Sequence, residues 1–184
     1  MKRKIILNLA MSVDGYIADE DGRFDWIKGD GHDTLNTANT WDYAKFLAGV
    51  DLVVMGKKSY DQGVIEEFRD KQVIVATSQK LADVDNIRFI GGDICGLIEQ
   101  ERQKPGQDIY LFGGGVLVDA FIKSDIIDEY IIGVIPIILG RGRPLFLGNN
   151  PTIRLKLEEY IVESGVVILR YSRSASLEKP RCSQ

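Results

Sequence analysis

Short apolar runs recur along the chain at intervals typical of strands that alternate with helices. Five of them are almost continuously apolar and rich in Ile and Val, which is typical of central strands covered on both faces. These runs occupy residues 4–10, 52–55, 72–76, 87–90 and 109–112, and a sixth strand-like run follows at 129–135.

Helical patterns lie between these runs, at about 34–48, 59–63, 94–102 and 116–123. Strands that alternate with helices predict an α/β fold with a largely parallel sheet and right-handed crossovers. The end of the chain departs from this rhythm, because 153–163 and 166–171 alternate apolar and polar residues around Glu163-Ser164-Gly165. That pattern predicts a β-hairpin, so we expect a mixed sheet with an antiparallel C-terminal edge.

The length and composition predict one domain. With 184 residues, 45% of them hydrophobic, the chain can bury a sizeable core. We expect the domain to span residues 1–173, and the polar, aperiodic residues 174–184 to form a disordered tail.

Charge and residue usage exclude several classes of function. A net charge of −4 argues against a nucleic-acid partner, and no apolar run is long enough for a membrane span. Two distant cysteines fit a reducing, cytoplasmic location. The single histidine, His32, lies in a loop-like stretch, so we expect neither imidazole catalysis nor a zinc site.

Candidate chemistry is concentrated where three strands end, in VVMGKKSY (53–60), VIVATSQK (73–80) and YLFGGGVL (110–117). Ligands of open α/β sheets bind outside the carboxyl ends of the strands, so these junctions predict one shared groove. Glycines let the backbone approach a phosphate, and a helix N-terminus favours an anion. Lysines and hydroxyls suit the extra 2′-phosphate that distinguishes NADP from NAD. Solvated lysines and an ordinary tight turn are the alternative reading. The usual Rossmann and Walker spacings are absent.

The order of several motifs resembles the dihydrofolate reductase superfamily, particularly the bacterial branch grouped with the reductase domain of riboflavin biosynthesis (RibD C-terminal-like). The resembling stretches, which precede a similar terminal hairpin, are LAMSVDGYIA (9–18), VVMGKKSYD (53–61), VATSQ (75–79), IYLFGGGVLVDAF (109–121) and IIDEYIIGVIPIILGRGRPLF (126–146). The resemblance implies a twisted eight-stranded mixed sheet flanked by helices in three layers. It also implies that NADPH lies across the strand ends.

The resemblance assigns residues to each part of that cofactor. It implies a nicotinamide lined by Ala10 and the loop around Gly15. It implies a cis peptide between Gly113 and Gly114. The phosphate-binding positions that it implies are Gly56, Lys57, Lys58, Ser59, Thr77, Ser78, Phe112, Gly113, Gly114, Gly115 and Val116.

The substrate side is less determined by the sequence. Asp42 and Phe46 reproduce the i, i+4 spacing of a carboxylate and a Phe on the first helix of folate reductases. A half-buried Asp42 would be the catalytic candidate, which anchors a pterin-like ring and influences its protonation, although Thr40 is nearly as well placed and Asp42 could be a solvated helix residue. Trp26 could stack on a planar ring or lie in the core. The stretch DQGVIEEFRDKQ (61–72) is acidic and lacks the arginine-rich signature of pyrimidine reductases that bind a ribose phosphate.

We therefore expect an NADPH-dependent reductase of a small planar heterocycle, either a pterin (dihydrofolate-like) or a pyrimidine as in riboflavin biosynthesis. The alternative is a non-catalytic nucleotide-binding or scaffold member of the same fold. The apolar stretch 131–139 and the C-terminal hairpin suggest a homodimer.

Overall fold

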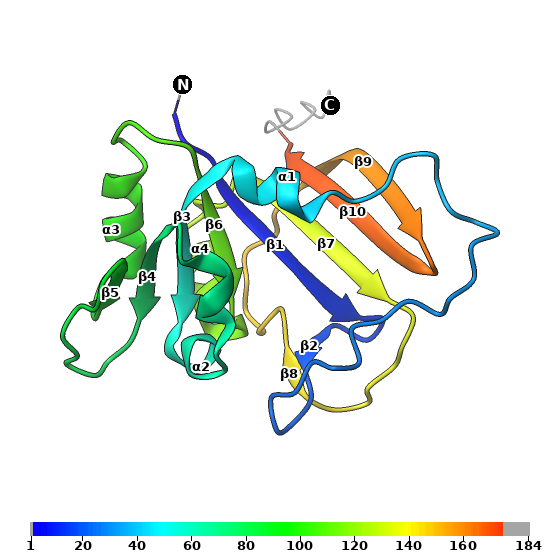
Figure 1. The fold of residues 1–184 in the computed structure, drawn as a ribbon, viewed down its shortest axis with the longest axis horizontal. Helices are drawn as coiled ribbons and strands as arrows, with labels where there is room; N and C mark the ends of the chain where they lie inside the picture. The colour runs from blue at the N-terminus through cyan, green and yellow to red at the C-terminus, as the bar shows by residue number, and fades with distance from the viewer. Residues whose placement is uncertain (1, 175–184) are drawn as a thin grey trace, which may run out of the picture.

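An eight-stranded sheet forms the centre of the protein in the computed structural model, which describes residues 2–174 (Figure 1). The strand order is β5-β4-β3-β6-β1-β7-β10-β9. The strands are β1 (Ile5–Ser12), β3 (Val50–Gly56), β4 (Gln72–Ala76), β5 (Ile87–Ile90), β6 (Asp108–Gly113), β7 (Glu129–Ile135), β9 (Leu155–Glu163) and β10 (Val166–Arg173). In this sheet order, the six strands from β5 to β7 run parallel to one another, whereas β10 pairs antiparallel with both β7 and β9. The predicted mixed α/β sheet and its terminal hairpin are confirmed.

Helices cover the two faces of the sheet unequally. On one face α3 (Ile94–Glu101) and α4 (Gly115–Lys123) bury Ile98 and Phe121 against Ile5 and Leu7 of β1. On the other face α1 (Tyr43–Ala48), α2 (Lys57–Asp61) and the 3₁₀ helix η1 (Val64–Phe68) pack over β3, β4 and β6. Because this second layer stops at β6, the same face of β1, β7 and β10 borders a cleft.

The helix predicted at about 34–48 is wrong in its first half, because α1 begins only at Tyr43. The preceding segment instead bonds to the β9–β10 hairpin: the Thr37 amide donates to the Val162 carbonyl (2.9 Å), and the Ser164 amide donates to Asn36 Oδ1 (2.7 Å). Asn, Asp and Thr side chains compete with helical hydrogen bonds in this way.

Other elements differ less from expectation. The sequence patterns missed η1 and the two-stranded ribbon of β2 (Tyr16–Ala18) and β8 (Arg143–Pro144). These strands are too short for a visible hydrophobic period. The tail predicted at 174–184 lies outside the described residues, except for Ser174, whose amide donates to the Arg154 carbonyl.

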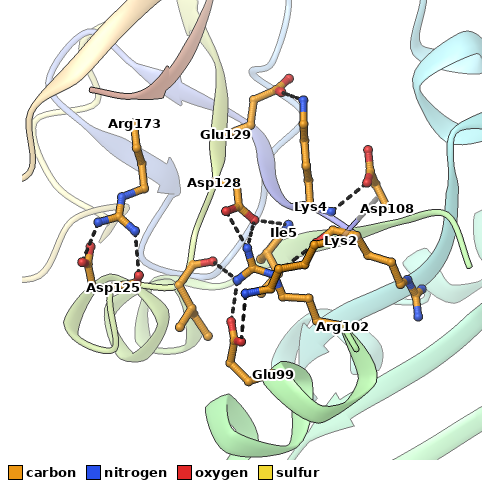
Figure 2. Close-up of polar contacts among 12 residues, drawn as sticks. Lys2, Lys4, Ile5, Glu99, Arg102, Asp108, Asp125, Asp128, Glu129 and Arg173 are labelled. Atoms are coloured by element: carbon orange, nitrogen blue, oxygen red, sulfur yellow. Dashed lines mark hydrogen bonds and ion pairs between the residues drawn. The ribbon is translucent and has the colours of Figure 1, made fainter. Parts of the chain in front are cut away.

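A buried arginine joins the elements at the amino ends of the central strands, the end opposite the cleft (Figure 2). Arg102, which follows α3, places Nη2 2.6 Å from both carboxylate oxygens of Asp128 and donates through Nε to the Arg3 carbonyl (3.1 Å). Asp128 also accepts the Ile5 amide (2.8 Å), and Arg102 Nη1 contacts Glu99. These contacts tie α3, β1 and β7 together.

Candidate functional site

A cleft of about 1360 Å³ lies across the carboxyl ends of the parallel strands and one face of the sheet. The three junctions singled out in the sequence all reach it, because parallel strands end at the same edge. Of the predicted cofactor residues, those that line the cleft are Ala10, Gly56, Lys57, Lys58, Ser59, Thr77, Ser78, Phe112, Gly114, Gly115 and Val116.

The Gly113-Gly114-Gly115 turn differs from expectation in one respect. The peptide bond between Gly113 and Gly114 is trans, not cis. The chain turns instead through positive φ angles at Gly113 (111°) and Gly114 (39°), which glycine adopts without a Cβ clash. Gly115 then begins α4, and a Cβ there would lie 2.4 Å from the Pro144 carbonyl oxygen. This third glycine therefore allows α4 to pack closely against β8.

Two predicted cofactor residues are close to the cleft without lining it. Gly113 is buried beside Leu9 and Val118. Gly15 closes the turn after β1: its amide donates to the Ser12 carbonyl, and its own carbonyl accepts the Leu145 amide (both 2.9 Å). Both residues shape the walls of the cleft from behind.

The neighbouring Asp14 fixes the same turn to the loop after β7. Its carboxylate accepts the Ser12 hydroxyl (2.6 Å) and the amides of Leu139 (3.1 Å) and Gly140 (2.7 Å). The hydrogen bond from Ser12 and those from the two amides outweigh desolvation and lower the pKa of Asp14. Asp14 is thus a turn-forming residue.

Asp42 is placed differently from the carboxylate that the resemblance implied. It is the N-cap of α1, where Oδ1 accepts the Lys45 amide (2.8 Å), and it is exposed and does not line the cleft. The expected half-buried carboxylate on a helical face is therefore wrong, because capping turns the side chain back toward the helix N-terminus. Phe46 packs edge-on against Tyr110, with ring centroids 5.0 Å apart, and supports the cleft wall.

Trp26 does not line the cleft either. It is half-buried, and its indole Nε1 donates to the Arg23 carbonyl (3.2 Å). Its neighbours Phe24 and Ile27 line the cleft and are exposed there. In this segment, Phe24 and Ile27 reach the cleft in place of the predicted Trp26.

Four polar side chains that sequence reasoning did not assign line the cleft together: Asn8, Tyr43, Glu67 and Tyr110. The Tyr43 hydroxyl donates to Glu67 Oε2 (3.4 Å), and the Tyr110 hydroxyl donates to the Asn8 carbonyl (3.0 Å). Burial, only partly offset by contact with Tyr110, raises the pKa of Tyr43 to about 12. Both the desolvation of the buried Tyr110 phenol and its contact with Tyr43 raise the pKa of Tyr110. Both phenols therefore remain protonated hydrogen-bond donors at neutral pH.

One signal for this group was present in the sequence. Asn8 is a polar residue inside an otherwise apolar strand, and strand alternation places it on the face of β1 opposite Leu7. Tyr43 and Glu67 gave no signal, because α1 and η1 bring them to the cleft only in the folded chain, and Tyr110 belongs to an apolar run of β6.

Metal and membrane sites receive no support from the described part of the chain. Within it, no group of three or more His, Cys, Asp or Glu side chains could hold a metal ion. His32 is exposed. Among residues 2–174, no helix is long and apolar enough to cross a membrane.

Comparison with known proteins identifies the family. The sequence pattern of the RibD C-terminal domain matches residues 3–168. The chain belongs to the RibD C-terminal domain family. The resemblance seen in the sequence motifs is therefore confirmed, and the fold agrees with it.

Two proteins with similar sequences occur in Bacillus subtilis (strain 168). The uncharacterized protein YwjB is 36% identical over 163 residues, which cover 85% of this chain and 91% of YwjB. The uncharacterized protein YyaP is 30% identical over 187 residues, which cover 92% of this chain and 95% of YyaP. Among solved structures, a "Putative riboflavin biosynthesis protein" from Shewanella sp. PV-4 has a TM-score of 0.76 and 28% identity, covering 95% of this chain and all of that one.

Proposed function

We propose that this protein is an NADPH-dependent reductase that transfers hydride to a small planar heterocycle of the pterin or pyrimidine class. The observation that carries the proposal is the convergence of three strand ends on one cleft. These ends bring Gly114 and Gly115, the pair Lys57–Lys58, and the hydroxyls of Thr77 and Ser78 to a single site.

The residues at this site fit NADPH. The Leu117 and Val118 amides both donate to the Gly114 carbonyl, so Gly115 and Val116 are first-turn residues whose amides have no acceptor within α4. Such amides, together with the helix dipole, suit a pyrophosphate. Thr77 and Ser78 suit the 2′-phosphate, with Lys58 as the exposed cation beside them, since Lys57 already pairs with Asp61.

The sheet offers a flat surface for a planar ring. The register places Ala10 opposite Gly133, so two small residues adjoin one another across β1 and β7, and Ile168 of β10 lies beside Gly133. All three residues line the cleft. Bound NADPH would supply the hydride, which adds to the carbon of a C=N bond while the nitrogen takes up a proton. The chain's own residues orient the ring and exclude water above this surface.

Two measurements test the proposal in sequence. The first is saturable quenching of the protein's fluorescence by NADPH. The second is loss of NADPH absorbance on addition of dihydropterin or aminopyrimidine substrates. Binding followed by turnover supports the reductase, and failure to bind at millimolar NADPH refutes it.

A second function, a non-catalytic nucleotide-binding protein, is favoured by one observation. Asp42, the carboxylate expected to assist protonation, is an exposed helix cap outside the cleft. NADPH binding without turnover of any planar heterocycle would support this function over the reductase.

A further inference from the structure

One of the carboxylates that line the cleft, Glu67, has no ion-pair partner among the described residues. Asp61 and Glu67 are the acidic residues that line it within the described chain. Asp61 is paired with Lys57. Glu67 accepts the 3.4 Å hydrogen bond from Tyr43. Since a carboxylate offers about four acceptor sites, Glu67 can still accept N–H groups from a ligand.

A buried amide without a partner lies on the same side of the cleft. Asn8 is 8% exposed, lines the cleft, and its side-chain nitrogen Nδ2 has no hydrogen-bond partner among the described residues. A buried polar atom left unpaired costs free energy, so a native protein that retains one needs a reason. A ligand acceptor that reaches this floor would satisfy the nitrogen.

Two tyrosines connect these groups. Tyr43 contacts both Glu67 and Tyr110, and Tyr110 donates to the backbone carbonyl of Asn8. Tyr110 is also held by the edge-on ring of Phe46. The exposed Glu67 and the buried Asn8 are therefore connected, through Tyr43 and Tyr110, by one series of contacts along the cleft.

The charge on this side disfavours an anionic ligand. Gln62, Val64 and Glu67 line the cleft from the segment after α2, and the nearby Arg69 is paired with Glu66 and does not line it. A phosphate or carboxylate at this position would face Glu67 without a neutralising cation from the same segment. Lys28, which is exposed, and Arg143, which is half-buried, line the cleft from other segments.

We propose that Glu67 and Asn8 form a substrate-recognition pair that selects an uncharged or cationic amino-substituted heterocycle over one with a phosphate or carboxylate tail. Glu67 accepts ring N–H or amino groups, and Asn8 Nδ2 donates to a ring nitrogen or carbonyl oxygen. This inference rests on the proposed reductase function and names its substrate class.

The test uses ligand pairs that differ in an anionic tail. One pair is 6-methyl-7,8-dihydropterin and 7,8-dihydrofolate, and the other is an aminouracil riboside and its 5′-phosphate. Dissociation constants are measured by calorimetry on the full chain saturated with NADP⁺, whose binding is measured first. In at least one pair the uncharged member should bind about tenfold more tightly, because the Glu67 carboxylate repels the anionic tail of the other member.

Four variants, one of them a control, assign the effect to residues. Glu67→Gln should weaken the uncharged ligand about tenfold, and Glu67→Lys should reverse the preference within the pair. Glu66→Gln, one position away and outside the cleft, should change neither. Asn8→Leu should raise the melting temperature, because it removes an unpaired buried polar group, and yet weaken the uncharged ligand about tenfold.

Several outcomes would overturn the inference while leaving the reductase intact. These are tighter binding of the tailed members, their loss of binding in Lys28→Ala, or an unchanged preference in Glu67→Lys. Binding of neither member of either pair to the NADP⁺-saturated protein would also overturn it. Failure of NADP⁺ itself to bind would instead refute the proposed function.

Discussion

Replacing Arg102 by Met should destabilise the protein far more than the same replacement at Arg173 (Figure 2). Both guanidinium groups lie 2.6 Å from an Asp oxygen, but the Arg102 side chain is 8% exposed and the Arg173 side chain 38%. Arg102→Met also removes donors from the Arg3 and Ile126 carbonyls. Removing one partner of a buried pair costs about 3–5 kcal/mol.

The lower end of that range applies here, because the remaining carboxylates of Asp128 and Glu99 are 30% and 32% exposed and keep contact with water. A loss of about 3 kcal/mol in a protein of this size lowers the melting temperature by roughly 6–12 °C. An exposed pair such as Arg173–Asp125 contributes about 0–1 kcal/mol, so Arg173→Met should lower it by no more than about 4 °C.

Thermal unfolding followed by circular dichroism measures both variants. NADPH affinity at a temperature where both remain folded serves as the control, since Arg102 lies at the end of the sheet opposite the cleft. Equal shifts for the two variants, or a larger shift for Arg173→Met, would refute the reasoning from burial.

Three further predictions concern packing and pH. Gly115→Ala should lower the melting temperature in thermal unfolding and weaken NADPH binding, because the new Cβ would lie 2.4 Å from the Pro144 carbonyl oxygen; unchanged stability and affinity would contradict it. Burial favours a higher pKa for Glu101, but contacts with Lys104 and Arg88 outweigh it and lower the pKa below 4.5. The stability that the ionised Glu101 contributes is therefore present above pH 4.5 and lost at lower pH. Urea unfolding at several pH values should therefore show that acidification lowers the free energy of unfolding less in Glu101→Gln than in the unchanged protein. An identical loss in the two proteins would contradict this. Because burial raises the pKa of Tyr43 to about 12 from 10.0, its contribution to stability is complete below pH 10 and lost as the pH rises toward 12; ultraviolet titration against Tyr43→Phe should show one phenol that ionises late.

The sheet could be predicted from the sequence because its strands are buried and apolar. The runs at 72–76, 87–90 and 129–135 match β4, β5 and β7 at both ends. That the candidate cofactor residues share one cleft could also be predicted, since glycines, lysines and hydroxyls directly follow or end β3, β4 and β6, and parallel strands end at the same edge of the sheet.

The substrate side could not be predicted in the same way. Two of its residues, Tyr43 and Glu67, come from α1 and η1, whose Phe46 and Phe68 pack against Tyr110. The segment before α1 looked helical, yet its hydrogen bonds go to a hairpin more than 100 residues later in the chain. Asp42 was chosen by spacing alone, and capping gave it a different role.

The proposed homodimer is open to measurement by light scattering. The edge strand β9 carries exposed Leu157 and Tyr160, which a partner could cover. A monomeric mass at micromolar concentration would refute the homodimer and leave the proposed cofactor site untouched.

The central claim is that the cleft binds NADPH through the ends of β3, β4 and β6. Calorimetric titration of NADPH and NADH, into the protein and into a Thr77→Ala, Ser78→Ala double variant, tests it most directly. The account predicts saturable NADPH binding, at least about tenfold tighter than NADH, with that preference largely lost in the double variant. Absence of NADPH binding at millimolar concentration, or a preference unchanged by the two substitutions, would contradict it.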